Sequence, residues 1–272
     1  MLFDKNKSIF LDQNPLFSII TVVYNADNCL EETIKSVINQ NYKNIEYIII
    51  DGGSTDNTLS IIKKYEKQIK VWISEPDNGI YEAMNKGISL CQGEIVGIIN
   101  AGDTYTSNAI SRIVESYQNQ SYPSIVVGDC KEFQSFDTQN WLIVSGRLNK
   151  LPYKMLPHPS VFVPLSIYKE MGVFNTDFKI AADYEFLCRC YKRSVPFIYV
   201  NQIIAIASPR GVSSNYYLTE VEYFKARINN DIPVILSVMN TCWSLVKITV
   251  HYLLDYFYIW HFVESWRHGS YR

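Results

Sequence analysis

Apolar runs alternate with helix-like segments through the first hundred residues of the chain. Short apolar runs bounded by polar turn residues predict buried strands at 17–24, 45–50, 70–74 and 95–99. Between them, apolar residues recur at helical spacing and predict three helices: one capped by Asn28, one capped by Thr55 or Asp56, and one spanning 80–90. This alternation is typical of an α/β protein whose sheet is mostly parallel and carries helices on both faces.

The pattern becomes mixed after Asp103 and predicts a more antiparallel region. The expected helices cover 108–118 and 181–191, and the expected short strands cover 124–127, 141–144, 158–163, 197–200 and 203–207. No repeat or low-complexity linker divides this part of the chain. We therefore expect one domain over residues 1–230.

Residues 234–263 are strongly apolar and rich in aromatic residues. Lys247, His251 and Asp255 interrupt this run at intervals of four residues, and Ser244 extends the same stripe. The spacing places them on one face of a helix and predicts an amphipathic tail over 231–272. Three interpretations stay open: contact with a membrane surface, packing on protein such as a second copy in a homo-oligomer, and a membrane span, which the charges disfavour.

The composition indicates a globular protein, because 47% of the 272 residues are hydrophobic and 19% are charged. A formal net charge of -2 provides no basic field for nucleic acid, so we expect no nucleic-acid partner. The first residues lack a basic segment followed by an apolar one, so no signal peptide is expected. The six cysteines are scattered without a CxxC pair, which favours reduced thiols in a cytoplasmic protein.

Three of the predicted strands end in polar, turn-forming residues. Asn25 follows the first, Asp51 ends the second, and Asp103 closes a small-residue turn after the fourth. Ligands of α/β proteins bind outside the carboxyl ends of parallel strands, so the three strand ends suggest one shared cleft. Each polar residue could also serve only as a helix cap.

Five segments together resemble a known family. They are 18–25 (SIITVVYN), 51–56 (DGGSTD), 77–87 (DNGIYEAMNKG), 100–103 (NAGD) and 182–185 (ADYE). In this order and spacing they are similar to family 2 inverting glycosyltransferases, particularly bacterial enzymes of capsule, exopolysaccharide (colanic acid among them) and O-antigen synthesis. The resemblance covers about residues 17–207. It implies the GT-A fold, a Rossmann-like α/β architecture with a mostly parallel sheet, here followed by a C-terminal helical extension.

The resemblance implies a nucleotide-diphosphate sugar as donor, and UDP-sugars are the commonest donors of the family. Asp51 corresponds to the residue that accepts a hydrogen bond from the nucleobase. Thr21, Tyr24 and Asn25 match the loop that encloses base and ribose. The remaining donor contacts are expected from Asn85, Lys86, Ala101, Gly102 and Asp103.

Asp103 also corresponds to the last carboxylate of the family's metal motif, where Mn²⁺ or Mg²⁺ bridges carboxylate and diphosphate. The chain departs from the family at three positions. Gly102 replaces the preceding carboxylate, Gly52 replaces a second aspartate, and Met84 replaces an arginine that binds the nucleotide. Lys86 is a nearby cation that could substitute for that arginine.

Asp183 matches the family's general base, and it falls at the start of a predicted helix, where the helix dipole favours a charged carboxylate. One base is enough for a direct displacement that inverts the anomeric carbon. The resemblance places His158 beside the diphosphate and acceptor, and Glu185 toward the acceptor.

The leading hypothesis is therefore a cytoplasmic enzyme, at the inner face of the membrane, that transfers a sugar to a saccharide or lipid-linked saccharide. The alternative is a non-catalytic nucleotide-sugar-binding or scaffold protein. A dinucleotide-dependent oxidoreductase is rejected, because no GxGxxG turn follows the first strand.

Overall fold

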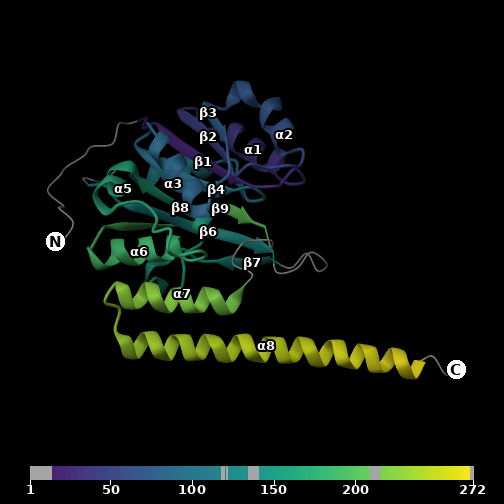
Figure 1. The fold of residues 1–272 in the computed structure, drawn as a ribbon. Helices are drawn as coiled ribbons and strands as arrows, with labels where there is room; N and C mark the ends of the chain where they lie inside the picture. Colours follow the sequence, from purple (N-terminus) through teal and green to yellow (C-terminus); the bar gives the residue numbers. More distant parts are fainter. Residues whose placement is uncertain (1–13, 118–119, 121, 134–140, 209–214, 270–272) are drawn as a thin grey trace.

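The computed structural model describes residues 14–117, 120, 122–133, 141–208 and 215–269. Within them the strands form one nine-stranded sheet in the order β3-β2-β1-β4-β8-β6-β9-β5, with β7 paired to β6 (Figure 1). The strands are β1 (Phe17–Val23), β2 (Ile45–Asp51), β3 (Val71–Ser74), β4 (Ile95–Asn100), β5 (Thr104–Tyr105), β6 (Ile125–Phe133), β7 (Trp141–Val144), β8 (Val161–Pro164) and β9 (Phe197–Ala207). The helices are α1 (Leu30–Ile38), α2 (Thr58–Lys64), α3 (Ile80–Leu90), α4 (Ala109–Tyr117), α5 (Leu165–Met171), α6 (Ala182–Lys192), α7 (Tyr216–Asn229) and α8 (Val234–Gly269), with short 3-10 turns η1 (Glu66–Gln68), η2 (Leu148–Lys150) and η3 (His158–Ser160).

The first half of the sheet is parallel, as the sequence predicts. Strand β1 pairs in parallel with β2 and β4, and β2 pairs in parallel with β3. The register sets Val23 opposite Asp51, Asp51 opposite Ser74, and Val22 opposite Asn100. The carboxyl ends of β1, β2 and β4 therefore lie side by side at one edge of the sheet.

The second half is mixed, because β8 pairs antiparallel with both β4 and β6 while β9 pairs in parallel with β6. The strand expected at 158–163 is wrong in its first half, where His158–Ser160 forms η3 and only Val161–Pro164 is extended. Pro157 and Pro159 cause this, since proline fixes φ and lacks an amide hydrogen for the ladder. The strands expected at 197–200 and 203–207 are one strand, β9, interrupted by a shift in register.

Helix starts differ slightly from the sequence prediction. Helix α1 begins after Cys29, and its N-cap makes no side-chain hydrogen bond, so the cap expected at Asn28 is wrong. Helix α2 begins at Thr58, whose amide donates to Asp56 Oδ1 at 2.9 Å. The N-cap of α2 is Asn57, which makes no side-chain hydrogen bond, so the cap expected at Thr55 or Asp56 lies one or two residues too early, although Asp56 still accepts from the first helical amide.

The core lies on both faces of the sheet because side chains alternate along each strand. On β1, Ile20 and Val22 pack toward α3, α5 and α6, whereas Phe17, Ile19 and Val23 pack toward α1, α2 and α4. This three-layer arrangement confirms the α/β class. It leaves the carboxyl edge of the parallel strands free for a site.

Helices α7 and α8 run side by side below the sheet, and α8 extends well beyond it (Figure 1). The break between them falls at residues 230–233, where the sequence analysis places the end of the first domain; the division itself stays a prediction. The side chains of His251 and Asp255, part of the predicted polar stripe, lie outside the described residues. Among the residues that the structure describes, no helix is long and apolar enough to span a membrane.

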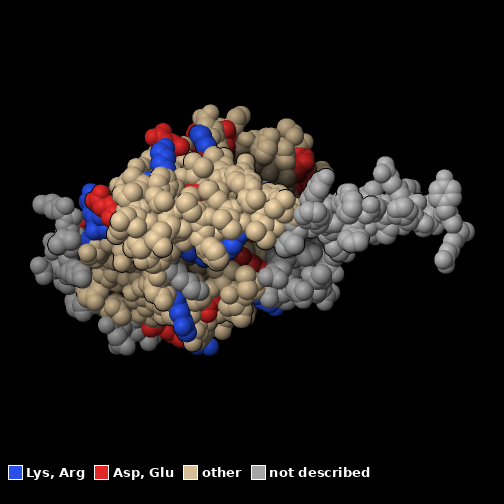
Figure 2. All heavy atoms as spheres, turned by 90° about the horizontal axis from the view of Figure 1, so that it is seen from below, with Lys and Arg blue, Asp and Glu red and all other residues tan. Residues whose placement is uncertain are grey.

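Helix α8 turns several polar side chains toward the protein, but Lys247 of the predicted stripe is exposed, with its Nζ 6.0 Å from the centroid of the Trp243 ring. Ser237 is buried, Asn240 Nδ2 donates to the Tyr153 carbonyl at 2.7 Å, and Thr241 Oγ1 accepts from Arg227 Nη2 at 2.9 Å. Its exposed apolar residues are Val234, Ile235, Leu236, Val238, Met239, Trp243, Val246, Val250, Tyr252 and Leu253. Seen from below in Figure 2, this side of the molecule is a broad face with few charged residues.

Candidate active site

A cleft of about 470 Å³ opens beside the end of β4. Its wall includes the turn after β4, the first turns of α3 and α6, the 3-10 turn η3, the end of β9, and helix α7. Its polar and charged lining residues are Tyr81, Asn100, Asp103, Glu132, Lys154, His158, Lys179, Asp183, Ser208, Tyr216 and Tyr223. The sequence-predicted residues Ala101, Asp103, His158 and Asp183 are thus brought together, although Asp183 is 80 residues from Asp103 along the chain.

Asp183 stands in the first turn of α6, as the sequence predicts. Its Oδ1 accepts two hydrogen bonds, from the backbone amide of Tyr184 at 2.8 Å and from the hydroxyl of Tyr81 at 2.9 Å. Its Oδ2 is 3.5 Å from His158 Nδ1. One carboxylate oxygen is therefore anchored, and the other makes a single longer contact beside the cleft.

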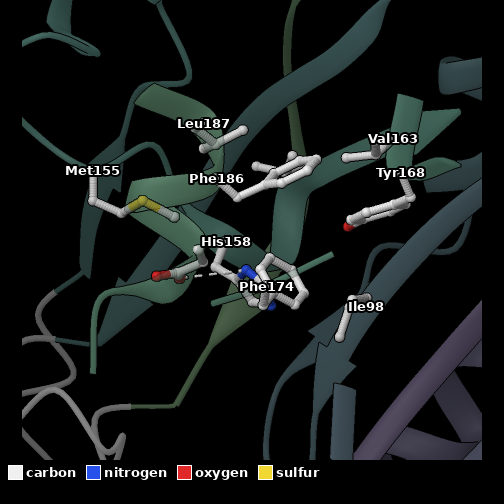
Figure 3. Close-up of a pocket in the computed structure, with 10 residues that line it drawn as sticks. Ile98, Met155, His158, Val163, Tyr168, Phe174, Phe186 and Leu187 are labelled. Carbon is white, nitrogen blue, oxygen red and sulfur yellow. Dashed lines mark ion pairs between the residues drawn. The ribbon is translucent and has the colours of Figure 1, made fainter. Parts of the chain in front are cut away.

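His158 lies in η3 and contacts Asp183 from the opposite wall; the dashed line in Figure 3 marks this pair. Burial lowers the pKa of His158, and the nearby charge of Asp183 opposes that shift. Its Nε2 is buried and has no partner among the described residues. Behind the pair is an apolar cavity of about 10 Å³, lined by side chains that include Met155, Phe174 and Phe186, which is at the limit for one water molecule (Figure 3).

The turn that carries Asp103 is built around Gly102. The amide of Asp103 donates to the Asn100 carbonyl at 3.0 Å, and Gly102 has a φ of 99°. The hydroxyl of Thr33 accepts from the Gly102 amide at 2.9 Å and donates to the Asp103 carbonyl at 2.8 Å. Only glycine adopts this φ without strain, so a carboxylate residue at position 102 would be strained in this backbone.

The carboxylate of Asp103 is almost fully buried. Burial raises the pKa of Asp103 to about 7, the Ser208 amide at 2.8 Å from Oδ1 lowers it, and the charge of Glu132 raises it further. Nearby, Asn100 Oδ1 is buried and without a hydrogen-bond partner among the described residues.

These oxygens fit a hard divalent cation, which prefers oxygen ligands. Asp103 supplies one carboxylate, Asn100 an unsatisfied amide oxygen, and Glu132 a second carboxylate on the same cleft. The described residues contain no group of three or more His, Cys, Asp or Glu arranged to hold a metal ion. A cation bound here would therefore need the phosphate oxygens of a ligand to complete its coordination.

The predicted base-binding residues lie at the same sheet edge but do not line this cleft. Asp51 is fully buried, and its Oδ2 accepts from the Gly53 and Ser54 amides and the Ser74 hydroxyl at 3.1, 3.0 and 2.6 Å. Its Oδ1 accepts from the Ser54 hydroxyl at 2.5 Å. In this structure the carboxylate of Asp51 shapes its own loop.

The loop after β1 is joined to the loop after β2. Asn25 has a φ of 46°, its amide donates to Ser54 Oγ at 2.8 Å, and its Oδ1 accepts from the Thr55 amide at 2.8 Å. The ring of Tyr24 is 63% exposed, so it is available to a ligand. Thr21, by contrast, is buried and bonded to the Tyr47 hydroxyl at 2.9 Å.

Three other predicted residues make structural contacts away from the cleft. Asn85 pairs through its amide with the backbone of Phe174, at 2.9 and 3.0 Å. Lys86 forms an ion pair with Glu75 at 2.5 Å. Glu185 is buried and pairs with Arg189 at 3.1 Å.

The other two departures from the family pattern also have a structural setting. A Cβ at Gly52 would come within 2.7 Å of Asp77 Oδ2, so the side chain of Asp77 occupies the space that an aspartate at position 52 would need. Met84 is buried and lines the cleft, so an apolar surface stands where the resemblance implies an arginine.

Several residues of the cleft have no role that was predicted from the sequence. Tyr81 belongs to a quoted motif, so its position could have drawn attention to it. Glu132, Lys154 and Tyr223 come from segments without a recognisable motif, and only the tertiary fold brings them to the cleft.

Comparisons with known proteins identify the fold and the family of the chain. The chain is similar to TarS of S. aureus in complex with UDP-GlcNAc, with a TM-score of 0.63 at 18% identity over 85% of this chain and 71% of that one; a longer TarS chain is covered over 43% of its length. It is also similar to the mannosyltransferase PcManGT from Pyrobaculum calidifontis in complex with GDP-Man and Mn²⁺, with a TM-score of 0.64 at 16% identity over 94% of this chain and 83% of that one. These structures show the same fold and confirm the expected GT-A architecture.

An uncharacterized glycosyltransferase of Mycobacterium tuberculosis is 30% identical over 186 residues, which are 64% of this chain and 68% of that protein. The family model for glycosyl transferase family 2 matches residues 18–193, which contain the turn of Asp103, His158 and Asp183. The chain is a glycosyltransferase and belongs to glycosyl transferase family 2.

Proposed function

We propose that this glycosyltransferase moves a sugar from a nucleotide-diphosphate donor, by preference a UDP-sugar, to a hydroxyl of a saccharide or lipid-linked saccharide in bacterial surface polysaccharide synthesis. The observation that carries the proposal is the carboxylate of Asp183. It lines the same cleft as Asp103 and is held there by two hydrogen bonds to Oδ1.

Asp183 serves as the general base in this proposal. Oδ1 is anchored, so Oδ2 takes the proton of the acceptor hydroxyl while the acceptor oxygen forms its bond to the anomeric carbon. The bond between that carbon and the diphosphate breaks in the same step, so the configuration inverts and no second carboxylate is required.

The donor diphosphate lies at the turn of residues 100–103 in this proposal. Asp103, Asn100 and Glu132 would hold Mn²⁺ or Mg²⁺, which when bound neutralises the charge on the diphosphate. The UDP-GlcNAc complex of TarS and the GDP-Man and Mn²⁺ complex of PcManGT support a nucleotide-sugar donor and a metal of this class.

The nucleoside binds beside the joined loops after β1 and β2. The exposed ring of Tyr24 offers an apolar face for the base, and Asn25 and Asp51 fix the shape of these loops. For Thr21, Asn85 and Lys86, binding of the sugar donor stays a prediction from the sequence. Their contacts in the structure are with other residues of the protein.

The exposed apolar face of α8 rests on the membrane surface in this proposal, on the cytoplasmic side. Tyr252 of α8 stacks on Tyr217 of α7 with ring centroids 5.8 Å apart, and the neighbouring Tyr216 lines the cleft. The apolar face is therefore continuous with the rim of the cleft, so a lipid-linked acceptor held in the membrane would present its sugar there.

Cosedimentation with anionic liposomes tests this surface. Met239→Glu combined with Trp243→Glu, both on the exposed face, should abolish sedimentation, whereas Val173→Glu, exposed in the loop after α5, should not. If wild-type protein stays in the supernatant and the double variant instead dissociates a dimer in light scattering, the face binds a second copy and the membrane proposal is wrong.

The transferase proposal is tested with a panel of UDP-, GDP- and dTDP-sugars in the presence of Mn²⁺, Mg²⁺ or EDTA. We expect slow release of nucleotide from one donor class, suppressed by EDTA and by Asp103→Ala. Asp183→Asn should bind the same nucleotide by calorimetry and lose turnover. No binding of any donor, or full turnover by Asp183→Asn, would contradict the proposal.

A further inference from the structure

Tyr81 joins the start of α3 to the start of α6, although 102 positions separate it from Asp183. The side chain is buried, with 6% of its surface exposed. Its hydroxyl lies 2.6 Å from the carbonyl oxygen of Ile180 and 2.9 Å from Asp183 Oδ1. Both acceptors stand at the beginning of the helix that carries the proposed base.

The hydroxyl has two acceptors within reach but only one hydrogen to donate. The carbonyl of Ile180 is neutral in every state of the enzyme. The carboxylate of Asp183 is charged before the reaction and neutral after it has taken a proton. A charged acceptor forms the stronger hydrogen bond, so the preferred acceptor of Tyr81 depends on the protonation of Asp183.

We propose that Tyr81 is a positioning residue for the transfer reaction, which anchors Oδ1 of Asp183 before the proton moves and turns its hydrogen to Ile180 afterwards. The inference rests on the proposed role of Asp183 as base. The proton of the acceptor hydroxyl goes to Asp183 Oδ2, and the electron pair of that O–H bond forms the bond to the anomeric carbon. Tyr81 keeps its own proton throughout, and only the acceptor of its hydrogen bond changes.

The surroundings keep Tyr81 in the role of donor. Burial, followed by the charge of Asp183, raises the pKa of Tyr81 well above its usual value, so the hydroxyl stays protonated. Among the described residues, the other titratable and charged groups near Asp183 include His158 on η3, Tyr168 on α5, Tyr223 and Glu222 on α7, and Lys179 before α6. Burial raises the pKa of both tyrosines, and it lowers that of His158.

The test compares Tyr81→Phe with Tyr117→Phe. Tyr117 is a matched control, because its buried hydroxyl also donates to a backbone carbonyl, that of Ser124 at 2.7 Å, but it lies in α4. Without the hydrogen bond from Tyr81, the protonated form of the Asp183 carboxyl group is favoured. The acidic limb of the rate–pH profile for hydrolysis of the sugar nucleotide should therefore shift to higher pH by about one unit in Tyr81→Phe. Tyr117→Phe should keep the wild-type profile.

A second variant changes the strength of this hydrogen bond without removing the hydroxyl group. Site-specific 3-fluorotyrosine at position 81 keeps the hydroxyl and makes it a stronger donor, so the acid side of the profile should move to lower pH. An unchanged profile in both variants would overturn the inference, as would equal shifts in Tyr81→Phe and Tyr117→Phe.

Carbon-13 NMR of the aspartate carboxyl groups provides a readout without turnover. The signal of Asp183 is assigned by its loss in Asp183→Asn, and its titration midpoint should rise in Tyr81→Phe. If Asp183→Asn retains full turnover, the proposed base is wrong whatever Tyr81 does. If Asp183→Asn is inactive but the titration midpoint is the same in wild type and Tyr81→Phe, only the inference about Tyr81 fails.

Discussion

Glu222 of α7 holds the segment immediately before the helix of the proposed base. Its side chain is buried, and its carboxylate accepts three backbone hydrogen bonds. The Lys179 amide donates to Oε1 at 2.8 Å, and the amides of Ile180 and Ala181 donate to Oε2 at 2.8 and 2.9 Å. Asp183 follows two residues later, so Glu222 fixes the position of the base from a helix that the sequence analysis did not predict.

Glu222→Gln keeps the shape of this side chain and removes its charge. The amide oxygen can face Ile180 and Ala181, but the NH₂ group then faces the amide of Lys179, which loses its acceptor. Loss of the acceptor of this part-buried hydrogen bond costs about 1 kcal/mol, and the two other hydrogen bonds become weaker because the acceptor is neutral. We expect a total loss of about 2–3 kcal/mol, which corresponds to a melting temperature lower by roughly 3–6 °C for a chain of 272 residues.

Thermal melting and donor hydrolysis together measure the effect. Besides the lower melting temperature, kcat should fall about tenfold, since a base displaced by a fraction of an ångström loses much of its effect. The KM for the donor should stay unchanged, because Glu222 is not among the residues that line the cleft. Glu115→Gln, an exposed carboxylate on α4, serves as the control and should match wild type. Wild-type melting and kcat in Glu222→Gln would refute the reasoning.

Three further predictions concern the donor side. Gly102→Ala should cost about 1–2 kcal/mol in urea unfolding, because φ at this position is 99°; equal stability would contradict the assigned strain. Since burial raises the pKa of Asp103 to about 7, ionisation of Asp103 destabilises the metal-free fold progressively as pH rises from about 4 to about 7. Asp103→Asn should therefore melt higher than wild type at pH 8 in EDTA and equally at pH 4, and the reverse order would contradict this. Asn85→Ala should lose about 1–3 kcal/mol by freeing both backbone groups of Phe174, with donor affinity by calorimetry retained if the contact is only structural.

The sequence predicted the parallel half of the sheet closely because each element there has its own local pattern. Strands β1, β2, β3 and β4 end within one residue of the predicted positions, and α3 has the predicted bounds. The positions of Asp51 and Asp103 followed from the same patterns, since carboxyl ends of parallel strands meet at one edge.

The second half was harder to predict because tertiary contacts decide its structure. Apolar residues of α7 do not form one regular stripe, so the helix has no clear sequence signal. Two prolines turned an apparent strand into η3 and so set His158 opposite Asp183. No spacing rule could have joined Tyr81 to Asp183 or Glu222 to Ile180, which are 102 and 42 positions apart.

Helix α7 connects the proposed base with the exposed face of α8. One end of this link is Glu222, which holds the backbone before Asp183, and the other is Arg227, which is fully buried and donates to Thr241 of α8. The buried side of α8 is polar because it meets these groups, and this orientation leaves the apolar side exposed. The same packing that positions the proposed base therefore determines which face of α8 is exposed.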